Sequence, residues 1–155
     1  MKILNKKWII TVINLLLLCV VVIGASLFFV FDDRLIGYVL LGLFLLCLGF
    51  IKMFGISIRS TRPDIVFGFI DNSILVLLAV FGGHFGGVAG AIIGGAVGNA
   101  VTDGIAGLFE GAEAERNFTA GKLENRTILG TAVGKMAGCL LGAGVILVIA
   151  HWLGW

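Results

Sequence analysis

The chain has 155 residues, of which 59% are hydrophobic and 13% are charged. A soluble domain carries roughly 25% charged residues, so this composition excludes a soluble globular protein and predicts an all-α integral membrane protein. No soluble catalytic domain would be left once the apolar stretches are set aside. We therefore expect the lipid bilayer as its surroundings, no nucleic-acid partner, no bound cofactor and no enzymatic activity.

Five apolar stretches follow one another along the chain, at about 8–31, 35–55, 64–83, 86–109 and 127–153. A helix needs about 20 apolar residues to cross a hydrocarbon core of about 30 Å, so each stretch predicts one transmembrane helix. The first is too long for a signal peptide and lacks a clear cleavage site, so we interpret it as an uncleaved span. The prediction is a single membrane domain over 1–155, with a helical hairpin over 8–55 and a three-helix core over 64–153.

The predicted connections contain typical turn and helix-start residues. Pro63 suits the first position of a helix, where its missing N–H would be unpaired in any case. The glycine-rich segment Gly82 to Gly87 predicts a turn between the third and fourth spans, and Glu110 to Arg126 predicts a polar loop before the fifth.

Basic residues are distributed unevenly over the predicted span ends. Lys and Arg concentrate in the cytoplasmic loops of membrane proteins, which predicts a cytoplasmic N-terminus and a C-terminus outside. Nine basic residues are then inside: Lys2, Lys6, Lys7, Lys52, Arg59, Arg62, Arg116, Lys122 and Arg126. Arg34 is outside, and Lys135 lies within a span.

Glycine recurs every four residues in the last two spans, and this spacing predicts glycine-zipper packing. The two stripes are Gly86, Gly90, Gly94 and Gly98 in the fourth span, and Gly130, Gly134, Gly138 and Gly142 in the fifth. Small residues four apart let a neighbouring helix approach closely. Thr102 continues the first stripe, whereas Asn99 and Asp103 lie on the stripe beside it.

Three ionisable residues lie inside apolar stretches: Asp71, Asp103 and Lys135. Charges within a span are costly, normally face the bundle interior, and mark a pathway or a site. Counted from the predicted cytoplasmic ends, these residues are about 9, 9 and 12 Å deep at the helical rise. Matching depths predict one shared site.

Oxygen-rich side chains around these charges predict a cation site, because Na⁺ and Ca²⁺ take oxygen ligands. The candidate ligands are Asp71, Asn72, Asn99, Thr102 and Asp103. Lys135 can only donate hydrogen bonds, so we interpret it as an internal counter-ion. Glu110, seven residues past Asp103 on the same face, would form a cytoplasmic entry or a solvated charge at the helix end. The alternative is a structural salt-bridged network that fixes helix register, although buried ion pairs stabilise poorly compared with apolar packing.

Three segments carry a resemblance to a known family: GFIDNSI (Gly68 to Ile74), GNAVTDGIAG (Gly98 to Gly107) and GKMAGCLLG (Gly134 to Gly142). In this order they resemble the transmembrane protein 65 family, whose animal members are mitochondrial inner-membrane proteins implicated in sodium-dependent calcium efflux. The resemblance covers about Asp64 to Val148 and implies an exchange-like function. It points to Asp71, Asn72, Asn99, Asp103 and Lys135.

The chain departs from the animal members in having no mitochondrial presequence and a short fourth loop, which favours a bacterial plasma-membrane relative. The leading prediction is a sodium/calcium or proton/calcium exchanger that works by alternating access, as a homodimer that pairs its glycine-lined helices. A cation channel and a non-transporting membrane scaffold are the alternatives.

Overall fold

The computed structural model describes the backbone of residues 6–32, 34–120 and 127–155, and the side chains of 8–32, 34–106 and 127–155. Within these ranges the regular secondary structure is entirely α-helical, which confirms the predicted class. The helices are α1 (Lys6–Phe29), α2 (Ile36–Met53), α3 (Ile58–Ala120) and α4 (Ile128–Trp152). All four are long and apolar enough to cross a membrane, as expected for a multi-pass membrane protein.

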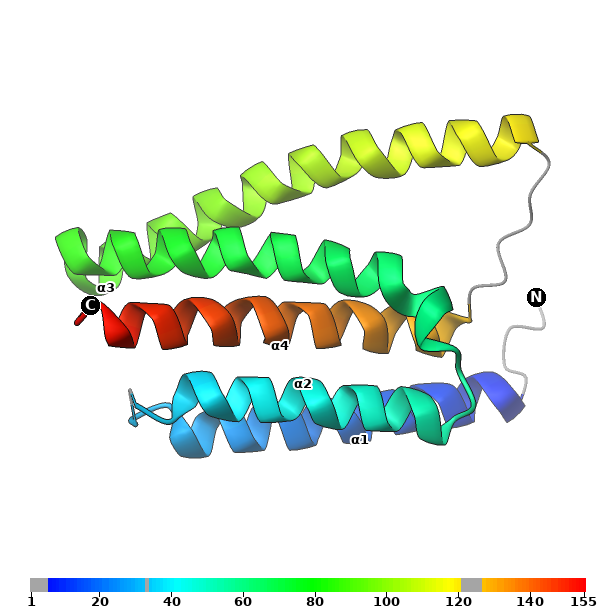
Figure 1. Ribbon diagram of the computed structural model, residues 1–155, viewed down its shortest axis with the longest axis horizontal. Helices are drawn as coiled ribbons and strands as arrows, with labels where there is room; N and C mark the ends of the chain where they lie inside the picture. The colour runs from blue at the N-terminus through cyan, green and yellow to red at the C-terminus, as the bar shows by residue number, and fades with distance from the viewer. Residues whose placement is uncertain (1–5, 33, 121–126) are drawn as a thin grey trace.

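Helix α3 folds back on itself at Gly87 (Figure 1). Gly87 has φ 58° and ψ −146°, a backbone conformation that side chains with a Cβ rarely adopt and that glycine tolerates. The residues on either side are helical, so α3 consists of a first limb, 58–86, and a second limb, 88–120, which run in opposite directions. We use these two names throughout.

Two predicted boundaries of α3 are wrong. The helix begins at Ile58, so Pro63 lies in its second turn rather than at its start. Ile58 packs against the hydrophobic core, which favours an earlier helix start than the proline suggested. At the other end, the predicted loop from Glu110 is helical up to Ala120. Its alanine and glutamate residues are strong helix formers. The rest of that loop, 121–126, lies outside the described residues.

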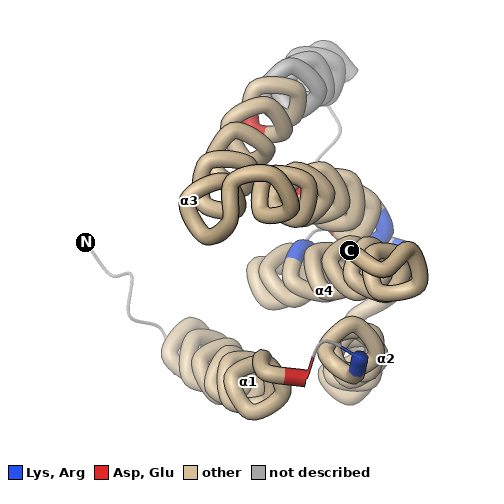
Figure 2. The backbone as a smooth tube through the Cα atoms, turned by 90° about the vertical axis from the view of Figure 1, so that its left-hand side faces the viewer, with Lys and Arg blue, Asp and Glu red and all other residues tan. Residues whose placement is uncertain are grey.

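Helix α4 lies between the first limb of α3 and α2, and α1 is at the periphery beside α2 (Figures 1 and 2). The core consists mainly of α2 and α4 side chains, among which Cys47, Ile51 and Val133 are fully buried. Thr127 caps α4, since its Oγ1 accepts a hydrogen bond from the Gly130 N–H at 3.1 Å. This agrees with the predicted start of the fifth apolar stretch.

The glycines of α4 lie against the first limb of α3. A Cβ at Gly142 would come 2.8 Å from Ser73 Oγ, and one at Gly138 would come 2.8 Å from the Phe69 nitrogen. From the opposite side, a Cβ at Gly68 would come 2.9 Å from the Cys139 nitrogen. The two backbones are therefore in direct contact, and no larger residue fits at these positions without a shift.

The start of α1 and the C-terminus lie at opposite ends of the helix bundle. Helix α1 begins at the end away from Trp155. Along the chain, α1, α2, the first limb, the second limb and α4 alternate in direction (Figure 1). Charged residues are sparse along the helices (Figure 2). The few polar side chains within the helices therefore lie inside or beside long apolar segments.

Candidate functional site

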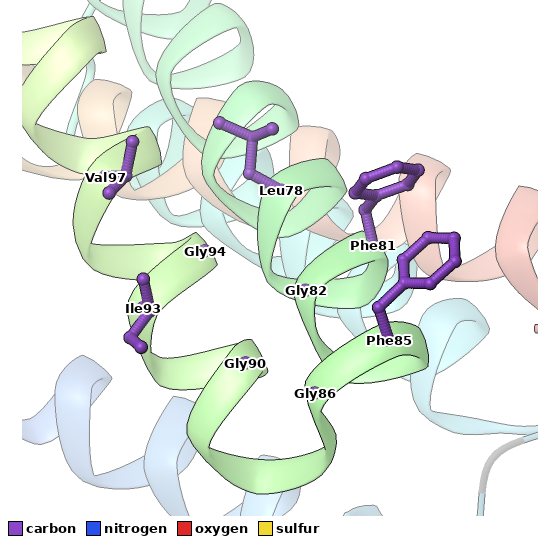
Figure 3. Close-up of a pocket in the computed structure, with 9 residues that line it drawn as sticks. All are labelled: Leu78, Phe81, Gly82, Phe85, Gly86, Gly90, Ile93, Gly94 and Val97. Atoms are coloured by element: carbon purple, nitrogen blue, oxygen red, sulfur yellow. The ribbon is translucent and has the colours of Figure 1, made fainter.

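The two limbs of α3 pack against each other in a fixed antiparallel register. Gly90 contacts the Gly82 carbonyl group, and Gly94 contacts the Leu78 carbonyl group. Figure 3 shows these four residues on the two facing limbs. One turn further from the bend, a Cβ at Gly98 would lie 2.8 Å from the Leu75 Cα. Each turn of the second limb therefore packs against the turn of the first limb that lies at a similar distance from the bend.

The next step of this register brings Thr102 opposite Asp71. Thr102 is 4% exposed, and its Oγ1 makes a short hydrogen bond with Asp71 Oδ1. The same hydroxyl oxygen lies 3.1 Å from the Gly98 carbonyl oxygen and 3.0 Å from that of Asn99. A hydroxyl group has one proton to donate, and a carboxylate is the strongest of these acceptors. Close glycine packing therefore places an oxygen-rich cluster between the limbs.

Asn72 points toward α4 instead of the second limb. Its Nδ2 donates a hydrogen bond to the Cys139 carbonyl oxygen at 3.1 Å. Neighbouring residues on a helix point about 100° apart, so Asp71 and Asn72 serve different contacts. The side-chain oxygen of Asn72 remains near the junction of the first limb and α4.

Lys135 lies on the α4 side of the same region and is half-buried. Its Nζ is 4.6 Å from the centroid of the Phe67 ring, which is within the range of a cation–π interaction. The Lys135 backbone carbonyl lies against Gly68. Lys135 is therefore at the level of Phe67 and Gly68, about one turn of the first limb before Asp71.

Asn99 and Asp103 lie on a different face of the second limb. Asn99 Nδ2 donates a hydrogen bond to Asp103 Oδ2 at 2.9 Å, and both residues are exposed. Thr102 is buried whereas its neighbour Asp103 is exposed, so the two side chains point away from each other. The structure thus brings together Asp71, Thr102 and the region of Lys135, and leaves Asn99 and Asp103 outside that cluster.

Within the described side chains, no three His, Cys, Asp or Glu residues are close enough to hold a metal ion together. Amide, hydroxyl and backbone oxygens would have to complete any cation site here. Glu110, the predicted cytoplasmic entry, lies outside the residues whose side chains are described.

Asp64 and Thr61 are buried polar residues that the sequence reasoning did not single out. They are 3% and 2% exposed, and they pack against Gly134, where a Cβ would come 3.1 Å from the Asp64 Cβ. Asp64 lies seven residues before Asp71, so both project from the same face of the first limb. That spacing is visible in the sequence, where Asp64 is the first residue of the third apolar stretch.

The cavity near the bend of α3 is apolar and separate from this cluster (Figure 3). Its volume is about 440 Å³, and it lies on the flank of the two limbs. Its lining residues are Leu78, Phe81, Gly82, Phe85, Gly86, Gly90, Ile93, Gly94 and Val97. This lining contains no ionisable side chain and suits an acyl chain or an apolar side chain rather than a cation.

Comparison of the chain with models of protein families, with curated proteins and with solved structures found no match.

Proposed function

We propose that this protein is a cation transporter, a sodium/calcium or proton/calcium exchanger that works by alternating access. The observation that carries the proposal is the contact between Asp71 and Thr102. An ionisable carboxylate inside an apolar segment faces a second helix rather than lipid, at the end of a glycine-lined contact. Such residues in membrane helices mark ion paths and sites. The resemblance to the transmembrane protein 65 family points to the same residue.

The proposal includes five membrane crossings with the N-terminus in the cytoplasm. The apolar part of α3, Ile58–Ala106, has 49 residues and would be about 74 Å long as one straight helix, more than twice a hydrocarbon core of about 30 Å. The bend at Gly87 divides it into two limbs of suitable length. Lys52, Arg59 and Arg62 lie near the α2–α3 connection, which the positive-inside rule assigns to the cytoplasm.

The oxygens between the limbs form the core of the proposed cation site. Asp71 supplies a carboxylate and Thr102 a hydroxyl oxygen, and the carbonyl oxygens of Gly98 and Asn99 lie near that hydroxyl. Hard cations take such ligands, with water or further amide oxygens completing the shell. Lys135 would neutralise Asp71 between transport steps, because a buried carboxylate requires a counter-charge. Asn72 faces α4, and Asn99 and Asp103 face away from these oxygens, so their proposed role as ligands would require a different arrangement of the limbs and α4.

The test is calcium movement in liposomes that contain the purified protein and carry a sodium or proton gradient. We expect flux from the unaltered chain and its loss in Asp71→Asn, which removes the charge with little change in shape. Asp32→Asn is the matched control. Asp32 Oδ1 accepts hydrogen bonds from two backbone N–H groups of the α1–α2 turn, a role that an asparagine oxygen keeps. Normal flux in a folded Asp71→Asn variant would overturn the proposal, and flux without a counter-ion would identify a channel.

A non-transporting scaffold is the second candidate, because two of the polar contacts also join helices. Thr102 links the second limb to Asp71, and Asn72 links the first limb to α4. A scaffold would tolerate the apolar pair Asp71→Leu and Thr102→Val, since well-packed apolar replacements of buried charges are often neutral or stabilising. A double variant that is stable and has lost calcium flux would favour the transporter.

A further inference from the structure

The second limb of α3 is attached to the rest of the molecule along one side only. Its glycine stripe and Thr102 contact the first limb, while Val88, Ile92 and Ile93 are between 63% and 80% exposed. In both views this limb lies at the edge of the molecule (Figures 1 and 2). We call its exposed side the outer face, which consists of Ala96, Asn99, Ala100, Asp103 and Gly104.

The outer face carries a charge where a lipid-facing helix should carry none. Asp103 is exposed, yet it lies inside the apolar candidate span that ends at Ala106. Ionisable residues in membrane helices almost always face protein or a water-filled cavity, because hydrocarbon solvates a carboxylate poorly. The hydrogen bond from Asn99 satisfies one carboxylate oxygen at 2.9 Å and leaves the other with acceptor capacity.

The same face has the small residues that close helix contacts require. Ala96, Ala100 and Gly104 are exposed and four residues apart, so they form a continuous shallow stripe beside Asn99 and Asp103. Among the residues that the structure describes, none lies within 4 Å of a Cβ added at Gly104. By contrast, the two glycine stripes that the sequence analysis assigned to a homodimer contact lie, apart from Gly86, against the first limb of α3 within the same chain.

We infer that a second copy of this chain docks on the outer face, with the second limbs of the two copies packed side by side around a two-fold axis normal to the membrane. Copies inserted in the same orientation place equivalent residues at equal depth. Each Asn99 amide then has one N–H for its own Asp103 and one for Asp103 of the partner subunit, so the surface is complementary to itself. Symmetric pairs are the commonest oligomers, and a self-complementary patch is their requirement.

Asp103 gives this interface a distinctive test. Two carboxylates brought together across a low-dielectric interface repel each other. Asp103→Asn removes that repulsion and keeps a hydrogen-bonding side chain of the same size, so this variant should dimerise more tightly than the unaltered chain. A lipid-facing aspartate that only reaches toward the membrane surface would show no such effect.

Disulfide cross-linking in native membranes tests the inference. Ala100→Cys should form a disulfide-linked dimer on mild oxidation, whereas Leu45→Cys, on the lipid-exposed side of α2, should not. The unaltered chain, whose cysteines Cys19, Cys47 and Cys139 lie on other helices, gives the background. Ala100→Leu should weaken association by about tenfold, as measured by the mass of the purified protein in detergent, because the added side chain separates the helices. Val101→Leu, on the neighbouring flank, should leave association unchanged.

Three results would overturn the inference: a monomer under all conditions, equal cross-linking at Leu45→Cys, or an intact dimer in Ala100→Leu. Cross-links from Ala100→Cys to a different protein alone would assign the outer face to that partner and would also overturn it. None of these measurements depends on ion flux, so the interface and the proposed transport function can fail separately.

Discussion

Helices α1 and α4 are similar in hydropathy and very different in packing. Their most apolar windows have mean hydropathies of 2.8 and 2.1, yet 6% of that window is buried in α1 and 44% in α4. Among the described side chains of α1, Leu18 alone is buried in the core. Helix α4 contacts both α2 and the first limb of α3 through backbone as well as side chains.

The difference shows what drives helix contacts inside a membrane. Lipid tails solvate apolar side chains as well as another helix does, so a high hydropathy gives α1 no reason to pack. Helix α4 has small residues at regular spacing, which let backbones approach and gain van der Waals contact. Polar contacts between helices gather in the same region, as the bond from Asn72 to the Cys139 carbonyl shows. Three sets of substitutions test this comparison.

The largest effect is expected from glycine substitution in the two helices. Gly138→Ala should destabilise the protein by about 1–3 kcal/mol, because its Cβ would meet the Ile65 carbonyl oxygen and the Phe69 nitrogen. Gly24→Ala in α1 should raise stability by less than about 1 kcal/mol, since no described residue lies within 4 Å of its added Cβ and alanine favours a helix. Reversible unfolding in mixed micelles measures both. Equal losses in the two variants would contradict the comparison.

An intermediate effect is expected from the two asparagines that hydrogen-bond to backbone carbonyl groups. Asn72→Leu removes a bond between α3 and α4 and should cost about 1 kcal/mol, the scale of interhelical hydrogen bonds in membranes. Asn14→Leu removes a bond to Ile10 within α1 and should cost close to nothing. The same unfolding assay compares them, and an equal cost would show that the bond to α4 contributes no tertiary stability.

The smallest effect is expected at the end of the bundle that holds Trp155. Trp152 Nε1 donates a hydrogen bond to Tyr38 Oη at 3.2 Å, which joins the last turn of α4 to the first turn of α2. The bond is exposed, so Trp152→Phe and Tyr38→Phe should each cost about 0.5 kcal/mol. Either single variant already removes this bond. The double variant should therefore lose the bond once and, beyond that, lose only the packing of the indole ring. A strictly additive pair of losses would show that the two groups do not interact.

Much of the fold could be predicted from the sequence, because hydropathy and caps are local signals. The predicted fifth stretch, 127–153, agrees with α4 to within one residue at each end, since Thr127 caps the helix where the apolar run begins. The turn near Gly87 was also predicted, although the structure narrows it to one non-helical residue. The start of α3 was missed because proline is a weaker signal than the packing of Ile58.

The candidate site was harder to predict, because periodicity gives stripes on a helix and not the helix that each stripe meets. The spacing placed Thr102 on the glycine stripe and Asn99 with Asp103 beside it, and the structure has both arrangements. The expectation that all six polar side chains converge required the stripe of Asn99 and Asp103 to face the other helices. In the structure this stripe is exposed. Its exposure depends on how the second limb is turned against the first, which periodicity does not give.

The one-residue bend at Gly87 has a consequence for the synthesis of the chain. No loop separates the two limbs, so an α3 that enters a membrane would enter it as a hairpin, each limb together with the other. The glycine stripe of the second limb would then be covered by the first limb before α4 is made. The side of the first limb that carries Gly68 would stay open for α4, which is made later.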